Sequence, residues 1–129
     1  GFVAIHDAVR PLVSQETIGI AFRIAELYGN AVPALSVKDT VRSVEGDKSS
    51  VVPRDTLRII QTPQVFRTSL IKRAYSLAQF TDFTDDASLL ETTGEKIHLT
   101  EGNRENIKIT FPSDLIIAEA IIQHLSPGF

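Results

Sequence analysis

The chain has 129 residues, of which 43% are hydrophobic and 22% are charged, proportions that suit one ordinary globular domain. Its net charge of -3 argues against a non-specific nucleic-acid binder, which would carry a broad basic surface. The absence of cysteine excludes a disulfide framework and a thiolate metal site. No apolar run approaches the roughly 20 residues that cross a bilayer, so neither nucleic acid nor membrane is expected as a partner.

The chain opens on a short apolar run, residues 2–5, that leads directly into a polar cluster of His6, Asp7 and Arg10. This pattern predicts a buried strand followed by a turn. In open α/β sheets, ligands bind just outside the carboxyl ends of the strands, where this cluster would lie. Because no cap or turn precedes residue 2, we expect the chain to be the later part of a longer protein.

The next elements are a helix and a second strand. Ser14 is a good N-cap, apolar residues recur with helical spacing up to Tyr28, and Gly29-Asn30 is a typical helix end, so we expect a helix over 14–28. Residues 31–37 form another apolar run, which predicts a strand. It ends in a second polar cluster, Lys38-Asp39-Thr40.

Residues 41–56 differ from the rest of the chain because their apolar residues alternate around a polar centre, Glu45-Gly46-Asp47-Lys48. This pattern predicts a β-hairpin. A lone hairpin is marginally stable in water. We therefore expect an arm that packs on something else.

The remaining chain alternates again between strand and helix patterns. A strand is expected over 57–60, ending at Gln61-Thr62-Pro63-Gln64, and a helix over 68–80. A further helix is expected after Phe83, capped by Thr84 and ended by Gly94. Strands over 96–100 and 106–110 precede a last helix that starts at Pro112. That helix is expected to bury Leu115, Ala118, Ile121, Ile122 and Leu125. The alternation predicts an α/β fold with a largely parallel sheet.

The polar clusters suit phosphate chemistry, but each also has a simpler interpretation. Lys and Arg neutralise phosphate oxygens, and a carboxylate can hold Mg²⁺. Asp7 and Arg10 can equally form an ion pair in a turn, and Lys38-Asp39 an exposed turn. Asp85-Asp86 can simply cap a helix, and Arg54 can be a surface residue. Lys108, inside an Ile-x-Ile strand, must face solvent, a ligand or a partner. The three histidines show no zinc-ligand spacing.

Six motifs occur in order along the chain: His-Asp-Ala-Val-Arg-Pro (6–11), Val-Lys-Asp-Thr-Val (37–41), Gln-Thr-Pro-Gln-Val-Phe (61–66), Thr-Asp-Asp-Ala-Ser (84–88), Glu-Gly (101–102) and Asn-Ile-Lys-Ile-Thr (106–110). With these motifs, the whole chain resembles the carboxyl-terminal part of the methylerythritol phosphate cytidylyltransferases of the non-mevalonate isoprenoid pathway. The ribitol phosphate cytidylyltransferases share most of the motifs and are the nearest alternative.

The resemblance implies a nucleotide-diphospho-sugar-transferase-like (Rossmann-like) α/β fold. It has a mostly parallel sheet flanked by helices, a protruding β-hairpin arm and a missing N-terminal part. Residues 1–129 would be the carboxyl-terminal part of a single domain, with a dimerisation arm at about 39–57. The implied enzyme transfers CMP from CTP to a sugar-alcohol phosphate and releases pyrophosphate. It would be a cytoplasmic homodimer, or a plastid one in a plant.

The resemblance also assigns roles to single residues. Asp7 would lie between the two substrates and hold Mg²⁺. Lys108 would position the attacking phosphate close to CTP, and Arg54 would do the same from the arm of a neighbouring subunit, swapped across the dimer. Substrate contacts are further implied for Arg10, Thr40, Thr62 and Thr84.

This chain departs from the family pattern in three ways. Val9 stands where Ala is usual, and Pro53 stands where Asp commonly precedes the arginine of the arm. The family's Gly-rich loop, with its Arg and Lys, does not occur in the 129 residues, which are therefore not expected to catalyse alone. A non-catalytic, dimerising phosphate-binding module and a transferase for another sugar phosphate stay open as alternatives.

Overall fold

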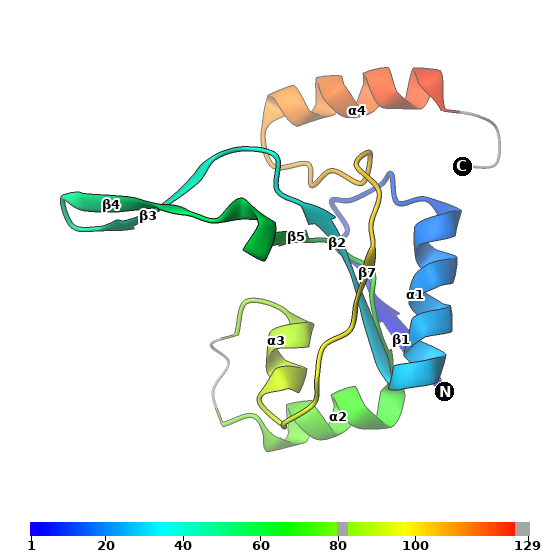
Figure 1. The fold of residues 1–129 in the computed structure, drawn as a ribbon. Helices are drawn as coiled ribbons and strands as arrows, with labels where there is room; N and C mark the ends of the chain where they lie inside the picture. The colour runs from blue at the N-terminus through cyan, green and yellow to red at the C-terminus, as the bar shows by residue number, and fades with distance from the viewer. Residues whose placement is uncertain (80–82, 126–129) are drawn as a thin grey trace.

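The computed structural model describes residues 1–79 and 83–125, and Figure 1 shows their arrangement. No helix of this part is long and apolar enough to cross a membrane. In chain order the elements are β1 (Phe2–Ile5), α1 (Gln15–Tyr28), β2 (Asn30–Ser36), β3 (Val41–Glu45), β4 (Lys48–Val52), a 3-10 turn (Arg54–Thr56), β5 (Arg58–Ile60), β6 (Gln64–Arg67), α2 (Thr68–Leu77), α3 (Asp86–Glu91), β7 (Leu99–Glu101) and α4 (Pro112–His124).

The central sheet is mixed. β6 pairs antiparallel with β1 on one side and with the start of β2 on the other, in the registers Val3↔Phe66 and Ala31↔Val65. The end of β2 pairs antiparallel with β5, and β2 also pairs parallel with β7. β1, β2 and β7 therefore share one direction, as expected for the α/β fold. The expectation of a largely parallel sheet is nevertheless wrong, because β6 lies between β1 and β2 and β5 pairs with the end of β2, so β2 with β7 is the one parallel pairing of this sheet in the described residues.

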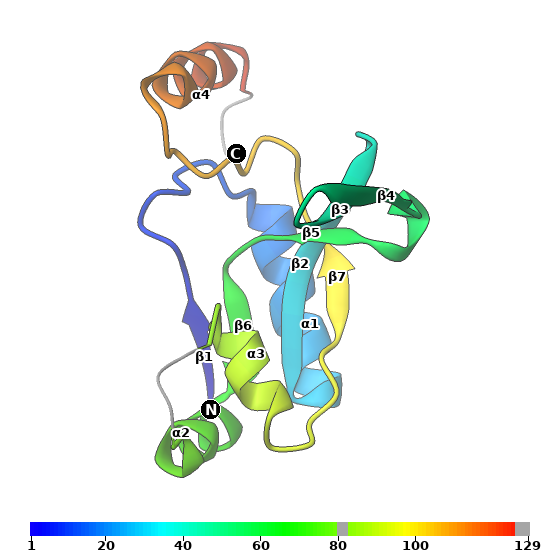
Figure 2. The same ribbon diagram turned by 90° about the vertical axis from the view of Figure 1, so that its left-hand side faces the viewer.

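Successive residues of the sheet point to opposite faces, and helices cover both. On one face, Ala31 and Val65 pack against Ala21 and Ala25 of α1. On the other face, the neighbouring residues Val32 and Phe66 join a cluster with residues of α2 and α3. Figure 2 shows α1 behind the sheet and α2 and α3 towards its other side. The core is thus a sheet between two helical layers.

The helix expected over 14–28 is confirmed as α1. The Ser14 hydroxyl oxygen accepts a hydrogen bond from the backbone N–H of Thr17 at 3.1 Å. Gly29 ends the helix with φ +91°, a left-handed conformation that favours glycine. The expected hairpin is confirmed as β3 and β4, which project from the body of the molecule (Figure 1).

The helix expected over 68–80 forms as α2 but ends at Leu77, and residue 80 lies outside the described residues. The strand expected over 96–100 is limited to β7, Leu99–Glu101. The structure departs from the expected elements at three further points. β6 is not among the expected strands: residues 61–64 are expected only as the end of the strand over 57–60, whereas Gln64 begins a separate strand of four residues. Asp85, not Thr84, is the N-cap of α3: its carboxylate accepts the backbone N–H of Ser88 at 2.9 Å. No strand forms over 106–110: the backbone N–H groups of Asn106 and Ile107 bond locally, and that of Ile109 donates to the Val9 carbonyl at 2.8 Å, in place of a ladder.

The last helix forms where expected, but its apolar face is not buried as expected. α4 lies apart from the sheet at one end of the molecule (Figure 1). Ala118 is buried, whereas Leu115 and Ile122 are 59% and 56% exposed. Apolar spacing predicts which residues share a face of a helix, but it does not show that a neighbour covers that face.

Candidate functional site

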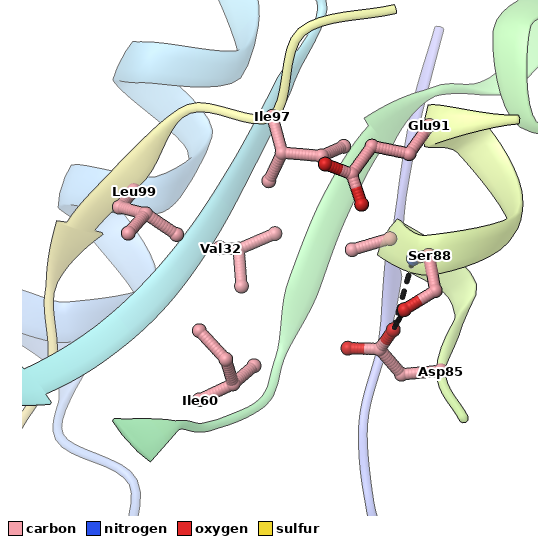
Figure 3. A pocket seen from close by; sticks show the side chains of 8 residues that line it. Val32, Ile60, Asp85, Ser88, Glu91, Ile97 and Leu99 are labelled. Atoms are coloured by element: carbon pink, nitrogen blue, oxygen red, sulfur yellow. Dashed lines mark hydrogen bonds between the residues drawn. The ribbon is translucent and has the colours of Figure 1, made fainter. Parts of the chain in front are cut away.

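A pocket of about 380 Å³ lies where the polar turns converge. Four chain segments line it: the loop after β1, the junction of β5 and β6, the start of α3 and the segment after β7. The lining residues are Asp7, Arg10, Ile60, Gln61, Thr62, Gln64, Thr84, Asp85, Ser88 and Lys108. A second hollow of about 280 Å³ adjoins it and shares Ile60, Asp85 and Ser88 (Figure 3). That hollow has an apolar floor that includes Val32, Ile97 and Leu99.

Five of the seven candidate residues line this pocket: Asp7, Arg10, Thr62, Thr84 and Lys108. The other two, Thr40 and Arg54, are exposed and do not line it. Arg54 lies in the 3-10 turn at the base of the arm, where its Nη1 donates to the Lys38 carbonyl at 2.7 Å. Within one chain, the fold thus gathers the residues of the body and leaves those of the arm outside.

Asp7 and Arg10 form the expected ion pair, with 3.0 Å between Arg10 Nε and Asp7 Oδ2. The pair is more than a local turn, because Arg10 Nη1 also donates to the Asn106 carbonyl at 2.8 Å. The Arg10 side chain is 11% exposed and that of Asp7 36%. Arg10 therefore braces the pocket, while Asp7 presents its carboxylate to it.

Thr62 is held on two sides. The backbone N–H of Asp7 donates to Thr62 Oγ1 at 2.9 Å. The same oxygen lies 2.8 Å from Nδ1 of His6, and Nε2 of His6 lies 2.8 Å from the Arg10 carbonyl oxygen. His6 is thus a bridge between the loop after β1 and the residue pair that precedes β6.

The start of α3 presents a second carboxylate, that of Asp85. The buried Gln64 side chain donates to Asp85 Oδ2 at 2.9 Å and accepts the Ala87 N–H at 3.1 Å. Burial raises the pKa of the Asp85 carboxyl, but hydrogen bonds from the Ser88 hydroxyl, the Gln64 amide and the Ser88 N–H outweigh it and leave the pKa below its ordinary value. Asp85 is therefore an anion at neutral pH, and its charge would repel a phosphate placed at that wall.

Three residues that support the pocket are not among the seven candidates. Gln61 donates to the carbonyls of Asn103 and Asn106 at 3.0 and 3.3 Å. Asn106, fully buried, donates to the Thr62 carbonyl at 2.8 Å. A Cβ on Gly102 would collide with Gln61 Oε1, which explains the glycine of the Glu-Gly motif. The sequence does contain a signal for these residues, because Gln61, Gly102 and Asn106 all lie in the motifs quoted above.

In residues 1–79 and 83–125, no group of three or more His, Asp or Glu side chains could hold a metal ion. Mg²⁺ does not require such a group, because it is usually bound by one or two carboxylates together with waters and substrate phosphates. Asp7 Oδ2 is engaged by Arg10, and the hydrogen bonds of the described residues leave Oδ1 unpartnered. Asp7 therefore fits a magnesium ion that a substrate phosphate shares.

The fold and the pocket define a class of protein: an α/β domain with a polar pocket beyond the end of a strand, lined by two cationic side chains, two carboxylates and hydroxyl groups. This is the charge pattern for a phosphorylated small molecule bound with a metal ion. The family model of the 2-C-methyl-D-erythritol 4-phosphate cytidylyltransferases (IspD) matches residues 1–124. The chain belongs to this family.

Individual members of this family are also similar to the chain in sequence and in structure. The chain is 48% identical over 122 residues to the 2-C-methyl-D-erythritol 4-phosphate cytidylyltransferase of Bacteroides fragilis, and 46% identical over 123 residues to that of Phocaeicola vulgatus. These matches cover 95% of this chain and 56% of each relative. The crystal structure of the enzyme from Thermus thermophilus matches with a TM-score of 0.88 and 39% identity, over 95% of this chain and 62% of that one. The chain thus spans a little over half the length of these relatives.

Proposed function

We propose that a protein carrying this chain transfers the cytidylyl group of CTP to 2-C-methyl-D-erythritol 4-phosphate. A phosphate oxygen of the sugar-alcohol phosphate attacks the α-phosphorus of CTP. The bond from that phosphorus to the bridging oxygen of the β-phosphate breaks, and pyrophosphate leaves. Because both substrates are polyanions, positioning and charge neutralisation carry most of the catalysis.

One observation carries this proposal: Asp7, Arg10, Thr62, Thr84 and Lys108 line a single pocket although up to 101 positions separate them in the sequence. Each is also a residue to which the family resemblance assigns a substrate contact. Lys108 is exposed, so its ammonium group is available to pair with the attacking phosphate. Thr84 is not needed to cap α3, because Asp85 does so, and its exposed hydroxyl, 3.2 Å from the Ser88 hydroxyl, can also contact a substrate in the pocket.

Magnesium has a place in this proposal at Asp7. When bound, the ion would neutralise charge on the phosphate oxygens of the two substrates as the new bond forms. The residues of this chain hold Asp7 ready for it: the Arg10 guanidinium fixes one carboxylate oxygen, and the backbone of Asp7 is anchored to Thr62. This arrangement orients the carboxylate before any ligand arrives.

The residues of the arm enter the proposal through a second subunit. Thr40 and Arg54 lie outside the pocket of their own chain, so their contacts to substrate require the swapped arm of a partner in a homodimer. In this view residues 1–129 are the carboxyl-terminal part of one catalytic domain, and the segment 39–57 is its dimerisation arm. The enzyme would act in the cytoplasm, or in the plastid of a plant.

The test is a coupled pyrophosphate-release assay on a polypeptide of full family length that contains these 129 residues. We expect turnover with CTP and methylerythritol phosphate, and far less with ribitol phosphate. Equal turnover with ribitol phosphate would contradict methylerythritol phosphate as the specific substrate. If neither sugar phosphate led to pyrophosphate release, a non-catalytic phosphate-binding module would be favoured.

A pair of lysine variants tests the site itself. Lys108→Ala should lower kcat/KM at least about 100-fold, the usual effect of losing a charge-stabilising group from an active site. Lys72→Ala removes another exposed lysine, from α2 and outside the pocket, and should leave turnover unchanged. If the two variants behaved alike, the assignment of Lys108 would be wrong.

A further inference from the structure

His6 makes two hydrogen bonds of equal length but does not itself line the pocket. Its Nε2 lies 2.8 Å from the Arg10 carbonyl oxygen, and its Nδ1 lies 2.8 Å from Thr62 Oγ1. Thr62, in contrast, is a lining residue. The imidazole therefore contacts the site through the hydroxyl group of Thr62 and the backbone carbonyl of Arg10, and of these two groups only the Thr62 hydroxyl is a side-chain group of the pocket lining.

The chemistry of these partners fixes the direction of each hydrogen bond. A carbonyl oxygen can only accept, so Nε2 must carry the hydrogen that the Arg10 carbonyl receives. In the neutral imidazole the other nitrogen then has no hydrogen, and Nδ1 accepts the hydroxyl hydrogen of Thr62. The N–H of Asp7 occupies one lone pair of the same oxygen. Thr62 is left with one lone pair and no hydrogen to offer.

We propose that His6 is a positioning residue that sets the hydrogen-bonding role of Thr62 in the substrate pocket. While the imidazole is neutral, Thr62 can only accept, and its natural ligand is a hydroxyl group of the sugar alcohol. A fully ionised phosphate oxygen has no hydrogen to give. Because Thr62 gives its own hydrogen to Nδ1, it cannot pair with such an oxygen. The charged groups that line the same pocket are Asp7 and Arg10 on the same loop, Lys108 after β7 and Asp85 at the start of α3.

The direction of the hydrogen bonds can be tested without any substrate, which separates this inference from the proposed function. The ¹⁵N chemical shifts of the His6 ring, recorded at mildly alkaline pH, report which nitrogen carries the hydrogen. We expect the Nε2–H tautomer. Thr62→Val, which removes the hydroxyl but keeps the side-chain shape, should shift the Nδ1 resonance. An Nδ1–H tautomer would overturn the inference, whatever the enzyme turns out to catalyse.

The consequence for binding rests on the proposed function, and two substitutions separate the two bonds of His6. The side chain of Asn reaches about as far as Nδ1, so His6→Asn can keep a partner for Thr62. The longer side chain of Gln reaches about as far as Nε2, so His6→Gln can keep the bond to the Arg10 carbonyl. We expect His6→Gln to raise the KM for the sugar-alcohol phosphate about 3- to 10-fold, the effect of one neutral hydrogen bond, and to leave the KM for CTP unchanged. His6→Asn should stay closer to the unmodified protein.

A double-mutant cycle decides between positioning and simple bracing of the loop. If His6 acts through the hydroxyl group, His6→Gln should have no further effect on the KM for the sugar-alcohol phosphate once Thr62 is replaced by Val. If His6→Gln costs the same with Thr62 and with Val at that position, His6 only braces the loop and the inference is wrong. A protein that folds but shows no transfer to methylerythritol phosphate would refute the proposed function instead, and the tautomer measurement would still stand.

Discussion

Replacing Asp7 by Asn separates the structural role of this carboxylate from its proposed chemical role. The ion pair with Arg10 is partly exposed, with 36% of the Asp7 side chain accessible, and exposed pairs contribute about 0.2 to 1 kcal/mol. Asn keeps an acceptor oxygen for Arg10 Nε, and the hydrogen bond from the Asp7 backbone N–H to Thr62 does not depend on the side chain. We therefore expect Asp7→Asn to lower the free energy of unfolding by no more than about 1 kcal/mol.

The effect on activity should be far larger. If Asp7 holds Mg²⁺ between two polyanionic substrates, the loss of its charge removes an interaction that strengthens in the transition state. Removal of one such group typically lowers kcat by about 100- to 1000-fold. Pyrophosphate release measures turnover, and urea denaturation measures the free energy of unfolding, both in the same full-length polypeptide.

Asp86→Asn is the matched control. Asp86 is a partly buried carboxylate one residue beyond Asp85, it accepts a hydrogen bond from the Tyr75 hydroxyl, and it does not line the pocket. The Asp86→Asn protein should therefore lose little activity. Loss of a charge-stabilising group should leave far less than about a tenth of the turnover. If Asp7→Asn kept more than that, or lost turnover only in proportion to the unfolded fraction, Asp7 would be no more than the partner of Arg10 in a turn.

Further predictions concern Asp85, Gly102 and the arm. The lowered pKa of Asp85 stabilises the fold at pH above the ordinary value of about 3.9, and this stabilisation is lost as the pH falls through the lowered pKa. Asp85→Asn should therefore flatten the pH dependence of unfolding in acid, as denaturation midpoints will show; an unchanged profile would refute it. Gly102→Ala should cost about 1 to 3 kcal/mol on chemical denaturation because Gln61 must move, whereas Gly19→Ala in α1 should be neutral or stabilising. Mixed dimers of Arg54→Ala and Lys108→Ala subunits should recover activity at one of their two sites, and no recovery in proven mixed dimers would count against the swapped arm.

The sequence predicts local structure well wherever local interactions decide it. α1 is an example, because Ser14 caps its start, Gly29 ends it, and its buried residues recur with helical spacing. The hairpin of β3 and β4 is another, since its turn and its alternation are close together in the sequence. In both cases the stabilising contacts join neighbours along the chain, so a pattern in the sequence records them directly.

The segment 106–110 shows where this reasoning fails. Its alternating Ile residues are typical of a strand, but the segment is held by distant side chains instead of a ladder. The buried Asn106 bonds to the Thr62 carbonyl, and its own carbonyl accepts from Arg10. The partners of Asn106 lie 44 and 96 positions away, and no local pattern reports such contacts. Resemblance to a family points to these residues, but only the structure gives the reason for them.

The division of the candidate residues between pocket and arm has a consequence for the whole assembly. The five lining candidates meet within one chain because the loop after β1, the junction of β5 and β6, the start of α3 and the segment after β7 converge at one place in the fold. Arg54 does not line this pocket, and its guanidinium bonds the Lys38 carbonyl at the base of a projecting hairpin. If Arg54 contacts the attacking phosphate, we expect the contact to come from another copy of the chain, as proposed above. The proposed site is then a property of the dimer, and its activity depends on protein concentration as dimerisation does.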